Sequence, residues 1–320
     1  MTHWSAGRVF RLLVATSLTA LALWTASPSA ALHAAAPADF RWIAAAIVLV
    51  VVDRALMAYR WLILLCPIDA DQRPALGAIM RVFFVSTFLG TFLPASVGGD
   101  IVRAFKLAQL RVARGPAVAS VIMDRLLGVL SIVLVGVAGL ILAPAGSLAS
   151  TRAIAVSLTL ASAICLAGAL VVFSERVALV AHRTLMWLPM AALRRLASEL
   201  TQATRAYAKF HPELTYVLVG SIGVQVLRVL QAYCLGRALA IEASPAAYFA
   251  FVPLILLVML LPVSINGIGT SQVAFVWFFG TVGVPSPEAL ALSVLFLALG
   301  VVGNLPGGLL YAFGPRSAPA

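Results

Sequence analysis

The sequence predicts an all-α polytopic membrane protein, with about six full spans and two re-entrant broken hairpins arranged as an inverted-topology repeat. The 320 residues are 62% hydrophobic and only 10% charged, and no water-soluble fold requires so much apolar surface. The apolar runs are continuous and about 20 residues long, which is the length of a membrane-spanning helix rather than of a barrel strand. An internal duplication is the third observation.

Two breaks in apolar segments share one sequence frame. Leu93-Pro-Ala-Ser-Val-Gly-Gly99 matches Leu261-Pro-Val-Ser-Ile-Asn-Gly267 at a constant offset of 168 residues. Positions 60–99 share 12 identities in 40 with positions 228–267, including Arg60 with Arg228. These identities favour a duplication, although chance in an apolar chain is the alternative. We therefore predict two membrane repeats, residues 1–150 and 151–320.

The first repeat begins with an apolar run at about 12–32, which follows Arg8 and Arg11. A cleaved signal peptide also fits this stretch, but we favour a retained first span because the apolar run is long. The next span is expected at about 42–65. It carries Asp53 and Arg54 near its middle, where charges must pair or face a polar interior.

The run at about 76–97 is expected to be the first re-entrant hairpin, with a simple span as the alternative. Basic residues on both sides place both of its ends in the cytoplasm. They are Arg60, Arg73 and Arg81 before or at its start and Arg103, Lys106, Arg111 and Arg114 after it. A full span at about 117–142 then carries the adjacent pair Asp124 and Arg125.

The second repeat is expected to start with a span at about 153–173 and a polar segment at about 174–213. Leucines at helical spacing make the polar segment an amphipathic surface helix, which most simply connects the two halves. In the following span, at about 214–235, Gln225, Arg228 and Gln231 come three residues apart and so lie near one helix face.

The chain ends with the second broken hairpin, at about 246–284, and a last span at about 289–313. Following the predicted spans across the membrane in order places both termini in the cytoplasm. The first hairpin then enters the membrane from the cytoplasmic side and the second from the outer side. Paired Gly/Pro-interrupted segments of this kind mark the binding site of inverted-repeat transporters. The two breaks are therefore the candidate site.

Pro94 and Pro262 stop the two apolar helices at the breaks. If residues 100–110 restart as a helix, their amide groups favour a phosphate-type anion. Asp100 fits either a cap of that helix or a ligand-site residue, and the glycines fit either close approach to a bound group or a tight turn. The candidate lipid-binding residues are Ser96, Gly98, Gly99, Asp100, Arg103, Lys106, Asp124, Arg125, Arg228, Ser264, Asn266, Gly267, Gly269 and Gln272.

The sequence lacks the patterns that are typical of nucleic-acid-binding proteins, metalloproteins and hydrolytic enzymes. The net charge of +11 would suggest nucleic acid in a soluble domain, but here the basic residues lie between apolar runs and orient the spans. The three cysteines and four histidines have no disulfide or metal-ligand spacing. No nucleophile–base pair or P-loop is evident. We therefore expect no catalytic site, metal, cofactor or nucleic-acid partner.

At these residues the sequence resembles the lysylphosphatidylglycerol synthase transmembrane family, which includes the flippase half of bacterial lysyl-lipid enzymes. Leu93-Pro-Ala-Ser-Val-Gly-Gly-Asp-Ile-Val-Arg103 is similar to its LP-x-x-x-GGD-x-x-R pattern, and Asp124-Arg125-Leu-Leu-Gly128 to its DR-x-x-G element. Pro262 to Gly269 is similar to its second glycine motif, and Leu305-Pro-Gly-Gly308 fits its terminal span. Gln272 departs from the glutamate that is common in the family. We expect a stand-alone member, because no synthase domain follows residue 320.

The resemblance implies a bacterial inner-membrane protein that moves or handles a lipid between leaflets, with a substrate that the fold does not specify. We expect an anionic headgroup between the hairpins, with Arg103, Lys106 and Arg228 balancing its phosphate, and alternating opening of the two halves. Membrane lipids and a lipid-biosynthesis enzyme are the expected partners. Two alternatives remain: a membrane-embedded transferase using Asp100 or Asp124 as an acid or base, and a scaffold for an aminoacyl-phospholipid, hopanoid or polyprenyl-linked pathway.

Overall fold

The structure is a computed structural model of the chain. It describes residues 36, 38–65, 67–68, 74–92, 98–110, 112, 114–142, 159, 163, 205–207, 209–260 and 267–313. The expected first span, nearly all of the span at 153–173 and most of the amphipathic segment lie outside the described residues. So do the break residues Pro94, Ser96, Pro262, Ser264 and Asn266, whose predicted roles the structure does not address.

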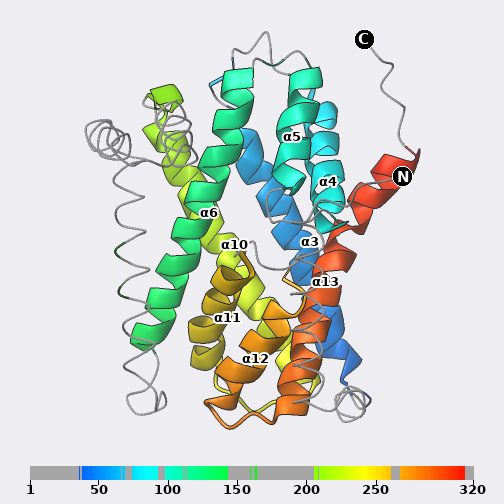
Figure 1. Cartoon of the computed structure of the whole chain (residues 1–320), viewed down its shortest axis with the longest axis vertical. Helices are drawn as coiled ribbons and strands as arrows, with labels where there is room; N and C mark the ends of the chain where they lie inside the picture. Colours follow the sequence, from blue (N-terminus) through cyan, green and yellow to red (C-terminus); the bar gives the residue numbers. More distant parts are fainter. Residues whose placement is uncertain are drawn as a thin grey trace, which may run out of the picture.

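Within the described residues the chain forms eight helices and no strand (Figure 1). They are α3 (Phe40–Ile63), α4 (Leu76–Phe92), α5 (Gly98–Gln109), α6 (Arg114–Leu142), α10 (His211–Ala238), α11 (Pro245–Leu260), α12 (Thr270–Gly280) and α13 (Ser286–Phe313). The predicted all-helical polytopic fold is confirmed. The number of spans and the inverted repeat stay predictions.

Four of these helices are long and apolar enough to cross a membrane. The shortest, α3, has 24 residues, which at about 1.5 Å per residue exceeds the roughly 30 Å of a hydrocarbon core. The helices α6, α10 and α13 have 28 or 29 residues. Each lies within a few residues of a span expected from the sequence.

The remaining helices form two short pairs. With 17 and 16 residues, α4 and α11 are each about 25 Å long, so neither spans a bilayer fully. The helix α4 packs against α5, and α11 packs against α12. In Figure 1 the α4–α5 pair lies in the upper half of the molecule and the α11–α12 pair in the lower half. The order long, short, short, long therefore occurs twice along the described chain.

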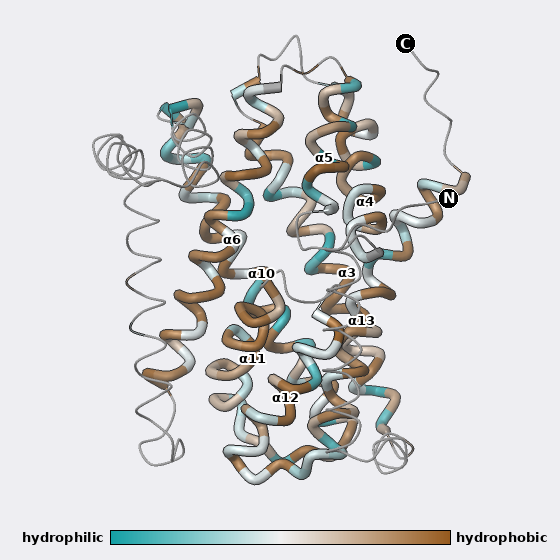
Figure 2. Tube along the Cα trace, viewed as in Figure 1, coloured by the Kyte–Doolittle hydropathy of each residue, from teal (hydrophilic) through white to brown (hydrophobic). Residues whose placement is uncertain are grey.

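The faces of the helices have the polarity expected in lipid. On α3, Val48, Val51 and Tyr59 are exposed, whereas Asp53 and Arg60 are buried. Apolar side chains suit contact with acyl chains, and ionised side chains in a membrane protein face the interior. Figure 2 shows hydrophilic residues at mid-height, among the hydrophobic stretches of the helices. The polar centre of the molecule is therefore internal.

Two hydrophobic clusters hold the helices around this centre. One is centred on α10 to α13 and contains the ring of Phe279, which contacts the rings of Tyr248 and Phe251 edge to face. The other joins α3 to α6 and contains Trp61 and Phe83, whose ring centroids lie 6.1 Å apart. Aromatic pairs of this kind fix the relative positions of the helices that carry them.

Glycines allow the closest crossings between the two halves. A Cβ atom at Gly139 of α6 would meet the backbone of Phe249 in α11. Likewise, a Cβ atom at Gly307 of α13 would meet the carbonyl oxygen of Phe84 in α4. Each short helical pair thus packs against the last long helix of the other half.

Candidate functional site

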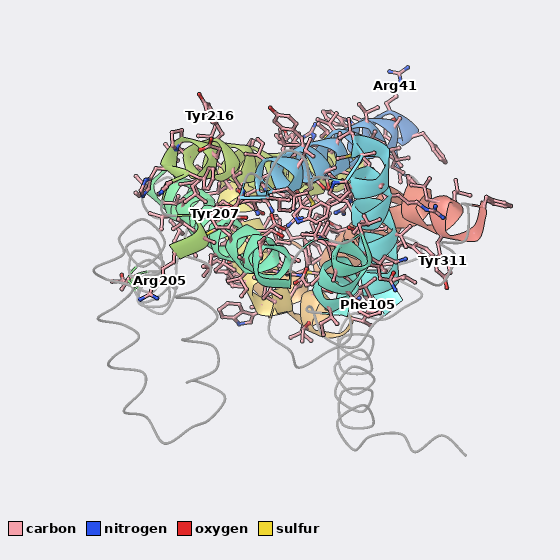
Figure 3. All side chains as sticks on the ribbon, turned by 90° about the horizontal axis from the view of Figure 1, so that it is seen from above. Arg41, Phe105, Arg205, Tyr207, Tyr216 and Tyr311 are labelled. Atoms are coloured by element: carbon pink, nitrogen blue, oxygen red, sulfur yellow. The ribbon has the colours of Figure 1, made fainter. Side chains whose placement is uncertain are left out.

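A polar cavity of about 320 Å³ lies among the helices of both halves. Side chains from α3, α4, α5, α6, α10, α11 and α13 line it. Its charged wall residues are Arg54, Arg60, Asp100, Arg103, Asp124, Arg125 and Arg228. Figure 3, viewed from above, shows nitrogen and oxygen atoms gathered between the helices in the middle of the bundle. This volume fits a small polar group such as a lipid headgroup.

Asp124 is the centre of the largest ion-pair network in the wall. Arg60 donates a hydrogen bond from Nη2 to Asp124 Oδ1 at 2.6 Å, and Arg103 donates from Nη1 to Asp124 Oδ2 at 3.1 Å. Arg60 also donates to the hydroxyl oxygen of Ser221 at 2.7 Å. One carboxylate therefore joins α3, α5 and α6, and Arg60 extends the network to α10.

Arg103 is further held by two aromatic rings. Its guanidinium carbon lies 5.2 Å from the ring centroid of Trp61 and 4.9 Å from that of Phe83, within the range of cation–π attraction. Lys106, which is predicted to balance the phosphate together with Arg103, does not line the cavity. The structure therefore places Arg103 in the wall as an anchored charge and leaves Lys106 outside it.

The adjacent residues Asp124 and Arg125 have different partners, because neighbouring side chains on a helix point in different directions. Arg125 Nε donates to Asp100 Oδ2 at 2.5 Å. Asp100 is in the first turn of α5 and is buried. The GGD element and the DR element of the sequence thus meet across the α5–α6 contact.

A third charge group surrounds Asp53, which is fully buried. Arg228 Nε lies 3.5 Å from Oδ1 of this carboxylate, and Arg54 Nη1 lies 3.6 Å from Oδ2. Both arginines instead donate to the thioether sulfur of Met57, each at 3.3 Å. A thioether is a weak acceptor. The guanidinium groups of Arg54 and Arg228 therefore converge, and each is held only loosely.

The second break has a capping role in the structure. The amide oxygen of Gln272 accepts from the backbone N–H of Gly269 at 2.6 Å and from the hydroxyl of Ser271 at 3.1 Å. This satisfies a free N–H at the start of α12. Gly267 and Gly269 have φ of +76° and +86°, which glycine adopts readily. None of these predicted site residues lines the cavity.

At the first break, Gly99 lines the cavity and also permits a tight helix contact. A Cβ atom there would lie 2.9 Å from the carbonyl oxygen of Ser86 and 3.2 Å from Cα of Gly90. Gly98 is buried and lies outside the wall. The close approach of α4 and α5 thus gives Gly99 a packing role in addition to its place in the wall.

Asp53, Arg54 and Arg60 are charged residues of the site that are not among the residues predicted from the sequence motifs. Asp53, Met57 and Arg60 are spaced as i, i+4 and i+7, and this helical face was the available signal. Arg60 and Arg228, which the 168-residue offset equates, both line the cavity. Two arginines that occupy equivalent positions in the proposed duplication, one on α3 and one on α10, thus line the same cavity.

The helix face predicted around Arg228 also lies at the cavity. Gln225 and Gln231 line it together with Arg228. Gln225 donates from Nε2 to the hydroxyl oxygen of Ser131 on α6 at 3.3 Å. This polar face of α10 therefore forms the part of the cavity wall where α10 meets α6.

The comparisons with known proteins give one match. The family described as the lysylphosphatidylglycerol synthase TM region matches residues 8–307. No curated protein and no solved structure matches the chain. The family match spans the described helices from α3 into α13, and it includes every charged residue of the cavity wall. The chain is therefore an integral membrane protein of the lysylphosphatidylglycerol synthase TM region family.

Proposed function

We propose that the chain is a flippase-like protein that moves a lipid with an anionic headgroup between the leaflets of the bacterial inner membrane. The observation that carries this proposal is the charge of the cavity, where, among the described residues, five wall arginines outnumber the two wall aspartates, Asp100 and Asp124, and Asp53 behind the wall. An excess of positive charge in a low-dielectric interior is costly unless an anion balances it. The family match supports a lipid as the source of that anion.

In this proposal the headgroup occupies the cavity while its chains stay in the bilayer. The cavity lies between helices of both halves, and each short pair packs against a long helix of the other half. Rocking of one half against the other would open the cavity to each side in turn. Cytoplasmic termini and a lipid-biosynthesis enzyme as partner belong to the same proposal and rest on the basic flanks and the family.

The proposal includes no catalytic step. Asp100 and Asp124 are the acids that a membrane-embedded transferase would use. Arg125 binds the first of them, and Arg60 and Arg103 bind the second. Carboxylates that serve as bridges between helices are suited to holding the wall of a binding site.

The Arg228→Gln substitution tests the proposal. We expect it to slow translocation of a fluorescent anionic lipid in reconstituted vesicles by about tenfold, because a loosely held guanidinium is lost from the cavity. Dithionite quenching of the outer leaflet measures the rate. The matched control is Arg41→Gln, which removes the same charge from an exposed position at the start of α3 (Figure 3). Equal rates for wild type, Arg228→Gln and Arg41→Gln would show that the cavity is not the route.

A further inference from the structure

The net charge of the side chains around the cavity indicates the charge of the headgroup that it binds. Among the described residues, the five wall arginines are opposed by three aspartates: Asp100 and Asp124 in the wall, and Asp53, which contacts Arg54 and Arg228 from behind it. Two positive charges are therefore left over. A ligand with two negative charges neutralises the cavity, whereas a ligand with one negative charge leaves one positive charge of the wall unbalanced.

The unpaired hydrogen-bonding atoms that line the cavity also favour an anionic ligand. Among the described residues, six buried polar atoms of the wall have no hydrogen-bond partner. Four are N–H donors and two are amide oxygens: Nε of Arg54, Arg60 and Arg103, Nε2 of Gln231, Oε1 of Gln225 and Oδ1 of Asn304. Behind the wall, both carboxylate oxygens of Asp53 are also without a hydrogen-bond partner. The four unpaired donors of the wall itself fit a group that offers several acceptor oxygens. A phosphate monoester offers three, with a charge of about −1.5 to −2 at pH 7.

Arg54 and Arg228 are the arginines best able to turn toward such a ligand. Arg60 and Arg103 are anchored by short hydrogen bonds to Asp124, and Arg125 by one to Asp100. Arg54 and Arg228 instead share the long contacts to Asp53 and the weak sulfur acceptor of Met57. A guanidinium group binds phosphate oxygens in a bidentate fork and far more strongly than it binds a thioether.

We propose that the cavity binds a dianionic phosphate, a phosphate monoester or a diphosphate, between Arg54 and Arg228. This inference rests on the proposed function, in which the phosphate is the headgroup of a lipid. The carboxylate of Asp53 sets the spacing between Arg54 and Arg228 and partly neutralises their positive charge. A singly charged phosphodiester is a poorer ligand, and an aminoacylated lipid with a net positive charge is the poorest.

Two probes that differ by one charge test the proposal. Dodecyl phosphate and dodecyl methyl phosphate have the same chain, and the methyl ester lacks the second ionisation. Binding to the full chain, purified in nanodiscs of phosphatidylcholine, is measured by titration calorimetry. We expect dodecyl phosphate to bind about tenfold more tightly than its methyl ester. Arg54→Gln and Arg228→Gln should each abolish this preference, and Arg41→Gln should keep it.

The Asp53→Asn substitution changes the charge of the site in the direction opposite to the arginine substitutions. It removes the carboxylate between Arg54 and Arg228 and raises the surplus from two charges to three, so we expect tighter binding of dodecyl phosphate. A weaker binding of both probes by a folded Asp53→Asn protein would contradict the assigned position of the site. Its folding is checked beforehand by size-exclusion chromatography, and the two arginine variants test the site if it does not fold.

The outcomes separate this inference from the proposed function. Equal binding of the two probes to wild type, reduced equally by Arg228→Gln, overturns the dianion and leaves an anionic-lipid cavity. Binding of neither probe contradicts both proposals. Inorganic phosphate is the third ligand. If it binds as tightly as dodecyl phosphate, the dianion site is supported but its natural ligand is a free phosphate, which contradicts the lipid function.

Discussion

Asp124→Asn is expected to lower the free energy of unfolding by about 3–5 kcal/mol, because it leaves two buried guanidinium groups without their shared carboxylate. Arg60 and Arg103 are each only 5% exposed, so water cannot replace the lost oxygen atoms. An asparagine amide accepts through one oxygen and carries no charge. Denaturant titration of the purified protein in mild detergent, followed by tryptophan fluorescence, measures the loss.

A double substitution separates the ion-pair network from simple loss of packing. Arg103→Gln added to Asp124→Asn removes one of the two stranded charges, so the pair should cost less than the sum of the single changes. Strictly additive costs would mean that Arg103 and Asp124 are not coupled. A wild-type stability for Asp124→Asn would contradict the bridging role of this carboxylate between α3, α5 and α6.

Gly139→Ala is expected to cost about 3 kcal/mol, a large effect for one methyl group. The added Cβ atom would meet the backbone of Phe249 rather than the end of a flexible side chain. The two helices can therefore relieve the clash only if α11 moves away from α6. We expect a lower unfolding midpoint in the same denaturant titration and a loosened α11–α12 pair.

Gly115→Ala is the matched control on the same helix. A Cβ atom at Gly115 has nothing within 4 Å, and alanine is the better helix former by about 1 kcal/mol. The control should therefore be neutral or slightly stabilising. If Gly139→Ala were as harmless as Gly115→Ala, the close crossing of α6 and α11 would be wrong.

The described spans could be predicted because each depends on local hydropathy alone. The expected spans at about 42–65 and 289–313 correspond to α3 at Phe40–Ile63 and α13 at Ser286–Phe313. Residues 76–97 and 246–284 were expected to break, and the observed short helices α4, α11 and α12 lie within or beside them. The start of each helix shifts by only a few residues, because capping and packing set the ends.

The pairing of charges could not be predicted, because it depends on how distant helices meet. Asp124 binds Arg60, which is 64 residues away, and Arg103, which is 21 residues away. From hydropathy and the positive-inside rule, Arg60 is predicted to flank the first hairpin. The rotation of α3 against α10 turns this side chain inward, where Ser221 completes its hydrogen bonds.

The sequence motifs predict part of the candidate site, but not the positions that depend on how the helices pack. The motif residues Asp100 and Arg103 line the cavity, because both face inward from one amphipathic helix. Lys106 follows at helical spacing but lies just beyond the wall. Gln272 was expected to contact a lipid, and its hydrogen bond to Gly269 instead places it at the start of α12. Any lipid contact of Lys106 or Gln272 stays a prediction.

The central claim is that the arginine-rich cavity selects an anionic lipid, and mass spectrometry of co-purifying lipids tests it most directly. Wild type and Arg41→Gln are compared with the Arg54→Gln/Arg228→Gln double variant, all purified from the same membranes. We expect one anionic lipid class to be enriched over the bulk membrane with wild type and with Arg41→Gln, and the enrichment to vanish in the double variant. A lipid profile equal to that of the bulk membrane for all three proteins would contradict the claim.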